Sequence, residues 1–544
     1  MCGLSLILEG KGKIYVGDSV YSLRTRQRRE SDQCDTSLNY MLSRRGPNST
    51  GLISGSMYHV MFVLRASLLQ FRGLKTIHCP LAYLDAEKSA LAFNGEIYSG
   101  LPFAGEGVSD TMQLYTSLIN SKTFEARLQV LSQLRGPWSL IFCDLKKNEI
   151  MIGRDCFGRR SLLFHLPDAV DPRFMVASTA PSVIPGQENL NWSELSCGVY
   201  HLRFSQSTEC RESEVHMAVH NWNGRIYKCL NERKGTQSWR GSSERVRPIC
   251  AFINSLDRSV ETRVHAREYL TSQVLDYSSG SDAATVMILF SGGLDSTVLA
   301  TLAHRHLPIL DTIDLCNVCF HHGSSPDRLA ARRAFGELRT VSPCRRWRFI
   351  EVNVGEVDVL KYLTHVKSLV HPKDTTMDFN IGFALWFATR ARGRSTFYSP
   401  DGEIETFDYC SRAKIVLLGQ GADELLGGYR RHRLAFETSG KEMFIKELNT
   451  DLERLWLRNM GRDDRVVSDL GREGRYPFLD EELVYEIRDM HTKHANAALL
   501  NGAEDKLLLR RSAFHLGLAV SSTRLKQAIQ FGSRVSRLET ILSK

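Results

Sequence analysis

The stretch VMILFSGGLDSTVLATLAHRH, residues 286–306, contains the pattern that decides the fold. Its first five residues are apolar, as in a buried strand of a parallel sheet. The glycine-rich connection SGGLDST follows at 291–297, and a helical run begins directly after it. Backbone N–H groups of such a loop and the positive end of the next helix point at one place, which favours an anion. The stretch therefore predicts a strand–loop–helix unit that binds phosphate groups.

The chain beyond this unit alternates between strand and helix patterns. Such alternation predicts a doubly wound α/β domain, whose ligands bind at the carboxyl ends of the strands. We expect strands at 313–320, 348–353 and 414–418 and helices at 326–339, 356–370 and 380–392.

A second glycine-rich segment, GQGADELLGGY at 419–429, follows the expected strand at 414–418. Asp295 and Asp423 would then lie at the ends of two strands of one sheet, where a pair of carboxylates suits Mg²⁺ on a phosphate chain. The first loop is not a Walker A loop, because the GK[ST] ending is missing. Lys526, in KQAIQFGS, would ordinarily be only a cation near the end of a helix.

Together with GRYPFLD (474–480) and DKLLLRRSA (505–513), these motifs resemble the ATP pyrophosphatase domain of asparagine synthetases, an adenine nucleotide alpha hydrolase-like fold. The resemblance implies that ATP with Mg²⁺ binds as a substrate complex and that no prosthetic group is needed. It matches Asp295 and Asp423 to metal-binding positions and Lys526 to a catalytic lysine near the α-phosphate. It further implies nucleotide contacts at Leu289, Ser291, Gly292, Gly293, Asp295, Ser296, Val318, Gly419 and Gln420.

The N-terminal part contains a different set of chemical groups. Removal of Met1 would make Cys2 the N-terminal residue, and a thiol beside a free α-amine has its own base. Asn94-Gly95 ends an apolar strand pattern and is either a turn or a pair of donors for an oxyanion. Asp110 stands with Ser109 where a helix should begin, as in an ordinary N-cap.

In this order, Cys2, Arg45-Gly46-Pro47, Arg65, Asn94-Gly95 and Ser109-Asp110 resemble the glutaminase domain of class II glutamine amidotransferases. That family is an N-terminal-nucleophile sandwich of two antiparallel sheets between helices. The resemblance implies that Cys2 attacks glutamine, that Asn94 and Gly95 hold the oxyanion, that Arg65 binds the α-carboxylate and that Asp110 binds the α-ammonium. Asn48 stands where the family often has Asp, which we interpret as a modest change in loop geometry.

The chain has 544 residues, a formal net charge of +9 and no apolar run long enough for a membrane helix, so we expect neither membrane nor nucleic-acid binding. Thirteen scattered cysteines indicate free thiols in a reducing, cytoplasmic compartment. The expected partners are glutamine, ATP and a small carboxylate acceptor, with a homodimer as a further candidate. We expect a glutaminase domain at 1–204 and a synthetase domain at 285–544. Residues 205–284 should form a polar connection that includes a helical start to the synthetase domain.

The whole chain thus resembles glutamine-hydrolysing asparagine synthetase, and most of all the divergent asparagine synthetase domain-containing proteins. The implied product is asparagine from aspartate, formed through an acyl-adenylate with release of AMP and pyrophosphate. Gln420 departs from the family, where an acid stands between the two glycines. A neutral amide takes no proton from ammonia at neutral pH. Two alternatives therefore stay open, namely a different acceptor carboxylate and a non-enzymatic interaction protein that keeps the fold.

Overall fold

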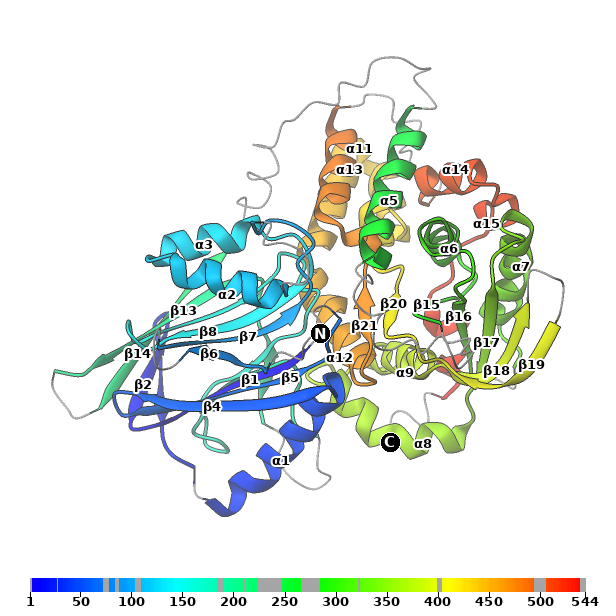
Figure 1. The fold of residues 1–544 in the computed structure, drawn as a ribbon. Coiled ribbons are helices and arrows are strands. Elements are labelled where there is room, and N and C mark those ends of the chain that lie inside the picture. Colours follow the sequence, from blue (N-terminus) through cyan, green and yellow to red (C-terminus); the bar gives the residue numbers. More distant parts are fainter. Residues whose placement is uncertain are drawn as a thin grey trace. The chain divides into compact units, whose positions relative to one another are not determined.

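The computed structural model describes residues 2–26, 28–71, 78–83, 88–102, 109–182, 190–208, 212–222, 247–265, 284–320, 323–398, 404–493 and 505–538. Side-chain positions are described for most of these residues, though not for Cys2. The chain divides into two compact units (Figure 1). The first unit comprises 1–231, 364–374 and 456–471, and the second comprises 232–363, 375–455 and 472–544. None of the described helices is both long and apolar enough to cross a membrane.

The first unit is built from two sheets that pack face to face. The six-stranded sheet has the order β12-β10-β11-β1-β5-β4 and is antiparallel throughout. Its strands are β1 (Cys2–Gly10), β4 (Ser49–Met57), β5 (Val60–Leu68), β10 (Leu163–His165), β11 (Phe174–Ala177) and β12 (Trp192–Glu194).

The eight-stranded sheet has the order β3-β2-β14-β13-β9-β8-β7-β6. The expected antiparallel arrangement needs one correction here, because β14 pairs in parallel with β2. β14 also extends this sheet beyond residue 204, into the segment that we expected to be a polar connection. Its strands are β2 (Gly12–Val16), β3 (Ser19–Leu23), β6 (Leu81–Tyr83), β7 (Ser89–Gly95), β8 (Trp138–Asp144), β9 (Glu149–Arg154), β13 (Gly198–Gln206) and β14 (Ser213–Asn221).

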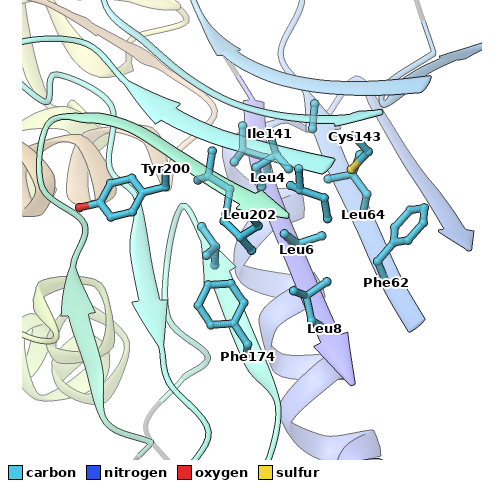
Figure 2. Packing of buried hydrophobic residues seen from close by; sticks show 14 of the residues in the cluster. Leu4, Leu6, Leu8, Phe62, Leu64, Ile141, Cys143, Phe174, Tyr200 and Leu202 are labelled. Atoms are coloured by element: carbon cyan, nitrogen blue, oxygen red, sulfur yellow. The ribbon is translucent and has the colours of Figure 1, made fainter. Parts of the chain in front are cut away.

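A hydrophobic core fills the space between these two sheets. Alternate residues of a strand face the same side, so Leu4, Leu6 and Leu8 of β1 all point toward the second sheet. Figure 2 shows these three leucines opposite Ile141 and Cys143 of β8. Helices cover the two sheets: α1 (Arg28–Arg45) packs on β1 and β5, and α2 (Asp110–Asn120) packs on β7 and on α3 (Phe124–Gln133).

A charged helix from late in the sequence is also buried in the first unit. All eight residues of α12 (Gly461–Ser468) are buried, and Asp464 accepts hydrogen bonds from Arg45 at 2.6 Å and from the backbone N–H of Ser161 at 2.9 Å. Arg160 forms an ion pair with Asp464 at 3.4 Å. Although burial alone would raise it, the charges of Arg45 and Arg160 hold the pKa of Asp464 below its usual value. The helix is therefore fixed by neutralised charge in addition to its buried valines, Val466 and Val467.

The second unit contains a seven-stranded sheet with the order β19-β18-β17-β16-β15-β20-β21. Five strands are parallel, and the expected parallel sheet needs a correction because β18 and β19 add an antiparallel hairpin at one edge. The strands are β15 (Val286–Leu289), β16 (Ile313–Cys319), β17 (Trp347–Asn353), β18 (Arg392–Tyr398), β19 (Ile404–Cys410), β20 (Ile415–Leu417) and β21 (Glu473–Arg475).

The connections reverse direction along this sheet. From β15 the chain moves outward to β16 and β17, and it later returns to β20 on the other side of β15. Parallel crossovers are right-handed, so connections that run in opposite directions cover opposite faces of the sheet. The expected helices are confirmed to within a few residues. They are α6 (Leu294–His306), α7 (Pro326–Val341), α8 (Glu356–Val370) and α9 (Thr376–Arg390).

Other helices of the second unit surround this framework. The described part of α5 runs from Arg247 to His265. The remaining helices are α10 (Ala422–Leu426), α11 (Arg430–Glu453), α13 (Glu481–Lys493), α14 (Leu507–His515), α15 (Ala519–Ser522) and α16 (Ile529–Gly532).

The buried ion pairs of α12 lead to the first prediction. Asp464→Asn leaves two buried guanidinium groups without their common counter-charge, so the free energy of unfolding should fall by about 3–5 kcal/mol. Asp408→Asn is the matched control, because Asp408 forms an exposed pair with Arg394 and 92% of its side chain is exposed. Urea-induced unfolding measures both variants, and equal stability of the two would contradict the structural role of Asp464.

Candidate active sites

In the first unit, Cys2 is the first residue of β1, a central strand. Its backbone pairs with Leu68 of β5, while its side chain lies outside the described part of the structure. β1 and β5 both contact β7, the strand that ends in Asn94-Gly95. The fold thus brings the strands that carry Cys2, Arg65 and Asn94 together from the two sheets.

Arg65 lies on β5, opposite Ser5 of β1. Its Nη1 atom is buried, and no acceptor within the described residues bonds to it. Burial lowers the pKa of the guanidinium. A buried N–H group that lacks an acceptor is costly, and a carboxylate would supply a charge-assisted hydrogen bond. Arg65 therefore has the geometry of an anion-binding residue.

Asn94 and Gly95 continue β7 instead of turning the chain. They pair with Ser139 and Trp138 of β8, so the turn alternative for Asn-Gly is wrong. Both residues are buried. A Cβ atom at Gly95 would collide with the carbonyl oxygen of Pro137 and lie 2.7 Å from Cα of Trp138. Close packing of two strands therefore requires glycine at this position.

Asp110 begins α2 and holds the segment that follows Gly95. Its Oδ2 atom accepts a hydrogen bond from the backbone N–H of Ile97 at 3.1 Å, and its Oδ1 atom accepts one from Thr111 at 2.7 Å. Ser109 caps the helix, as expected, by accepting a bond from the backbone of Met112 at 3.3 Å. The structure thus joins Asp110 to the chain just after Asn94-Gly95.

In the second unit, the two glycine-rich loops leave the carboxyl ends of β15 and β20, which are neighbours. This is the place where the strand order reverses and where doubly wound sheets bind ligands. Leu289 ends β15, Val318 lies near the end of β16 and Gly419 follows β20. Gln420 lies half-buried between β20 and α10. The predicted nucleotide contacts thus come from three adjacent strand ends.

The first loop has a backbone conformation that depends on glycine. Gly292 has φ +69°, and a Cβ atom there would collide with the backbone of Ala331 in α7. The Ser291 hydroxyl accepts a hydrogen bond from the backbone N–H of Gly293 at 3.2 Å. Thr297 and Ser296 donate to the Gly293 carbonyl at 2.8 and 3.2 Å. Serine and threonine side chains therefore fix the loop at the N-terminus of α6.

Asp295 and Asp423 are brought together by a lysine. Lys506 Nζ donates to both carboxylate oxygens of Asp295, at 2.8 and 2.6 Å, and lies 2.6 Å from Oδ1 of Asp423. Lys526 Nζ lies 2.7 Å from Oδ2 of Asp423 and 4.0 Å from the ring centre of Tyr429. The four charged groups form a carboxylate–lysine cluster, a name kept below for Asp295, Asp423, Lys506 and Lys526.

The surroundings shift the pKa values of the two carboxylates in opposite directions. Burial raises the pKa of Asp295 against the opposing charge of Lys506. Asp423 experiences the same burial, yet Lys506 and Lys526 together lower its pKa to about 2. The Lys506 ammonium is buried too, and its two carboxylate partners raise its pKa. Asp423 is accordingly ionised throughout the neutral pH range.

Comparisons with known proteins show the family of the chain. The family model "Asparagine synthase" matches residues 281–446. Asparagine synthetase domain-containing protein 1 of Homo sapiens is 32% identical in an alignment of 606 positions, gaps included, that covers 93% of this chain and 92% of the human protein. The chain belongs to the asparagine synthetase domain-containing family.

Two further relatives differ in how much of the chain they match. An asparagine synthetase domain-containing protein of Saccharomyces cerevisiae is 29% identical and covers 91% of this chain and 88% of its own length. A putative glutamine-hydrolysing asparagine synthetase of Methanocaldococcus jannaschii is 32% identical over 235 residues, which cover 42% of this chain and 36% of that protein. The domain-containing relatives therefore match nearly full length, whereas the named synthetase matches a part.

Lys506 is the site residue that our interpretation of the sequence missed. The segment 505–513 contributed to the resemblance, but we expected no role for its lysine. Lys506 directly precedes α14, where the positive end of the helix disfavours a cation, and it has φ +53°. The position of the lysine before the helix was the signal in the sequence. Its partners lie in the first turns of α6 and α10, 211 and 83 residues earlier, and no local sequence pattern indicates this pairing.

The donor set of the cluster fits Mg²⁺. Two carboxylates at adjacent strand ends are hard oxygen ligands, and Mg²⁺ is commonly held by one or two carboxylates together with phosphates and water. Within the described residues, no group of three or more His, Cys, Asp and Glu side chains could hold a metal. Asp295 and Asp423 could therefore supply two of the ligands of a Mg²⁺ ion, with phosphate and water as the others.

Gly428 provides the space for this cluster, which leads to the second prediction. A Cβ atom at this position would collide with Oδ1 of Asp423 and lie 2.5 Å from Cε of Lys506. Gly428→Ala should lower the free energy of unfolding by about 1–3 kcal/mol, because the lysine and carboxylate must separate. Gly336→Ala in α7 is the control. It has open space around it and should gain about 0.5–1 kcal/mol.

Calorimetric unfolding of the two variants measures the difference. A Gly428→Ala protein as stable as Gly336→Ala would show that the cluster does not need the glycine.

Proposed function

We propose that this protein is a glutamine-dependent, ATP-consuming amidotransferase of asparagine synthetase type. The observation that carries the proposal is the carboxylate–lysine cluster at the carboxyl ends of β15 and β20. Two carboxylates and two ammonium groups beside a glycine-rich helix N-terminus suit a metal-bound triphosphate better than a neutral ligand. The proposed products are an amide, AMP, pyrophosphate and glutamate.

The first unit would release ammonia from glutamine. After removal of Met1, the α-amine of Cys2 accepts the thiol proton and the sulfur attacks the carboxamide carbon. Asn94 and Gly95 donate hydrogen bonds to the oxyanion. Arg65 and Asp110 hold the α-carboxylate and the α-ammonium, and the buried Nη1 of Arg65 supports its assignment. The α-ammonium of Cys2 then returns the proton to the amide nitrogen, the C–N bond breaks and ammonia leaves. Water hydrolyses the remaining glutamyl thioester to glutamate and frees the thiol.

The second unit would activate a carboxylate. The 291–297 loop and the N-terminus of α6 bind phosphate oxygens, while Asp295 and Asp423 hold Mg²⁺. The metal ion would neutralise charge on the pyrophosphate that leaves. Lys526 donates to the oxygen on which negative charge develops, and the ring of Tyr429 fixes its ammonium. The carboxylate oxygen attacks the α-phosphorus, and ammonia then displaces AMP from the acyl-adenylate.

Aspartate is the first acceptor that we propose, because the family model and several relatives bear the name of asparagine synthesis. A second candidate is an amidotransferase for another carboxylate. Gln420 favours it, because this neutral side chain follows β20 at the metal-binding loop where synthetases have an acid. The ten cysteines whose side chains are described are free thiols, which supports a cytoplasmic location.

Pyrophosphate release in the presence of ATP, Mg²⁺, glutamine and aspartate tests the function. Wild-type protein should release pyrophosphate and form asparagine. Cys2→Ala should abolish the glutamine-dependent reaction and keep the one supplied with ammonium chloride. Asp423→Asn should abolish both, because a metal ligand is lost. Mass spectrometry of the N-terminus provides a check, since a retained Met1 would leave Cys2 without a free α-amine.

The outcomes separate the candidates. Pyrophosphate release with other small carboxylates but not with aspartate would support the second acceptor class. Absence of both pyrophosphate and glutamate formation would contradict an enzymatic role.

A third prediction concerns Gln420 alone. If Gln420 limits proton removal from ammonia, Gln420→Glu should raise the rate of amide formation about 100-fold or more, the lower end of the usual range for general base catalysis. Gln420→Asn is the control, because it keeps a neutral amide. The measurement is the ratio of amide to pyrophosphate formed, and an unchanged ratio in Gln420→Glu would show that this position does not limit the acceptor step.

A further inference from the structure

We propose that Lys506 and a divalent metal ion compete for the same pair of carboxylates, so that the metal binds only together with a nucleotide. This inference rests on the proposed ATP site. It assigns to Lys506 the position of a bridging cation between Asp295 and Asp423. When a nucleotide binds, its phosphates would pair with the Lys506 ammonium and displace it from the carboxylates.

The contacts of Lys506 are those of a bridging cation. Its single Nζ atom reaches both oxygens of Asp295 and one oxygen of Asp423, all within 2.8 Å. The side chain of Lys506 is only 4% exposed, whereas those of Asp295 and Asp423 are 25% and 22% exposed. The lysine therefore enters from the protein side, and the carboxylates remain open toward solvent.

The backbone holds Lys506 in this position. Its φ of +53° is uncommon for a residue with a side chain, and such conformations persist where the surroundings fix them. Arg510 of α14 provides this support. Its Nη2 atom donates to both carboxylate oxygens of Asp505 at 2.9 Å, and its Nη1 atom donates to the carbonyl of Arg524 at 2.7 Å. One guanidinium thus positions the segments that carry both lysines of the cluster.

Charge balance gives the reason for competition. The two carboxylates are matched by Lys506 and Lys526, so a divalent ion that enters alone adds two uncompensated charges to a largely buried site. It would also find only two protein carboxylates as ligands, because the described residues offer no third acidic, His or Cys partner in a metal-binding group. A free metal ion is therefore poorly held while Lys506 stays in place.

A nucleotide changes both conditions. Its phosphate oxygens supply the missing ligands, and their negative charge gives the displaced Lys506 ammonium a new partner. Metal and nucleotide should consequently bind with positive coupling, each raising the affinity for the other. Lys526 differs in this respect, because it contacts only Asp423 and lies on the ring of Tyr429. It shares the charge of Lys506 without occupying the bridging position.

Manganese binding tests this inference without measuring activity. Electron paramagnetic resonance counts free Mn²⁺ in titrations of the full chain with manganese chloride, with and without α,β-methylene-ATP. Lys506→Met should bind Mn²⁺ alone at least tenfold more tightly than wild type. Lys526→Met is the matched control, since it removes one positive charge next to Asp423 but leaves the bridge. It should raise the affinity too, but clearly less than Lys506→Met does. Asp423→Asn shows which Mn²⁺ signal belongs to the site.

The results distinguish the inference from the function on which it rests. If wild type binds Mn²⁺ tightly without nucleotide and Asp423→Asn abolishes that binding, competition is wrong, and this test needs no lysine variant. Equal Mn²⁺ affinity of folded Lys506→Met and wild type, with nucleotide still recruiting the metal to both, would also overturn the inference alone. Failure of wild type to bind the nucleotide with Mn²⁺ would instead contradict the proposed function.

Discussion

The interaction of Lys506 with Asp295 and Asp423 is the constraint on which the second unit depends. It joins the loops after β15 and β20 to the start of α14, and so it connects three segments that are distant in sequence. Two carboxylates at neighbouring strand ends would repel each other in a buried place, and the lysine converts that repulsion into attraction. The two carboxylates can therefore lie close together while they stay partly open toward solvent.

The first unit uses the same principle with arginine. Asp464 lies between Arg45 and Arg160, while Arg465 on the same helix donates to Glu194 at 2.7 Å. Arg45 belongs to the segment before Asn48, whose side chain accepts a hydrogen bond from the backbone of Gln70 at 3.1 Å. The loop that follows α1 is thus fixed by buried charge and by a polar side chain. Asn48 can do this because an amide oxygen accepts the bond without a charge.

Regular alternation made much of the second unit predictable. The strand and helix patterns between 286 and 370 match β15, α6, β16, α7, β17 and α8, because each element shows its own hydrophobic period. α12 could not be predicted in this way. Its sequence, GRDDRVVS, is typical of an exposed helix, but all its residues are buried against partners that lie hundreds of positions earlier. The β18–β19 hairpin likewise follows from edge pairing and not from an apolar run.

In the candidate sites, too, the sequence motifs identified residues, but the contacts of these residues with distant parts of the chain could not be predicted. Gly95 and Asp110 could be identified from motifs in the sequence. The structure adds that a side chain at Gly95 would collide with the backbone of Pro137, and that Asp110 accepts a hydrogen bond from Ile97. Gly292 depends similarly on α7. Motifs identify which residues matter because chemistry limits the residue types that can perform a role. Packing decides what each residue touches, and that information is spread over the whole chain.

The surroundings of Gln420 sharpen the question of the acceptor. Another carboxyl group lies four residues further on, in α10, and burial together with Asp423 raises the pKa of Glu424. Glu424 nevertheless accepts a hydrogen bond from the Tyr429 hydroxyl at 2.6 Å, and the Tyr429 ring supports Lys526. This carboxyl group is therefore used to position the ring, and it is only 2% exposed. Glu424 is thus engaged by Tyr429, which links this buried carboxyl group through the aromatic ring to Lys526 of the cluster.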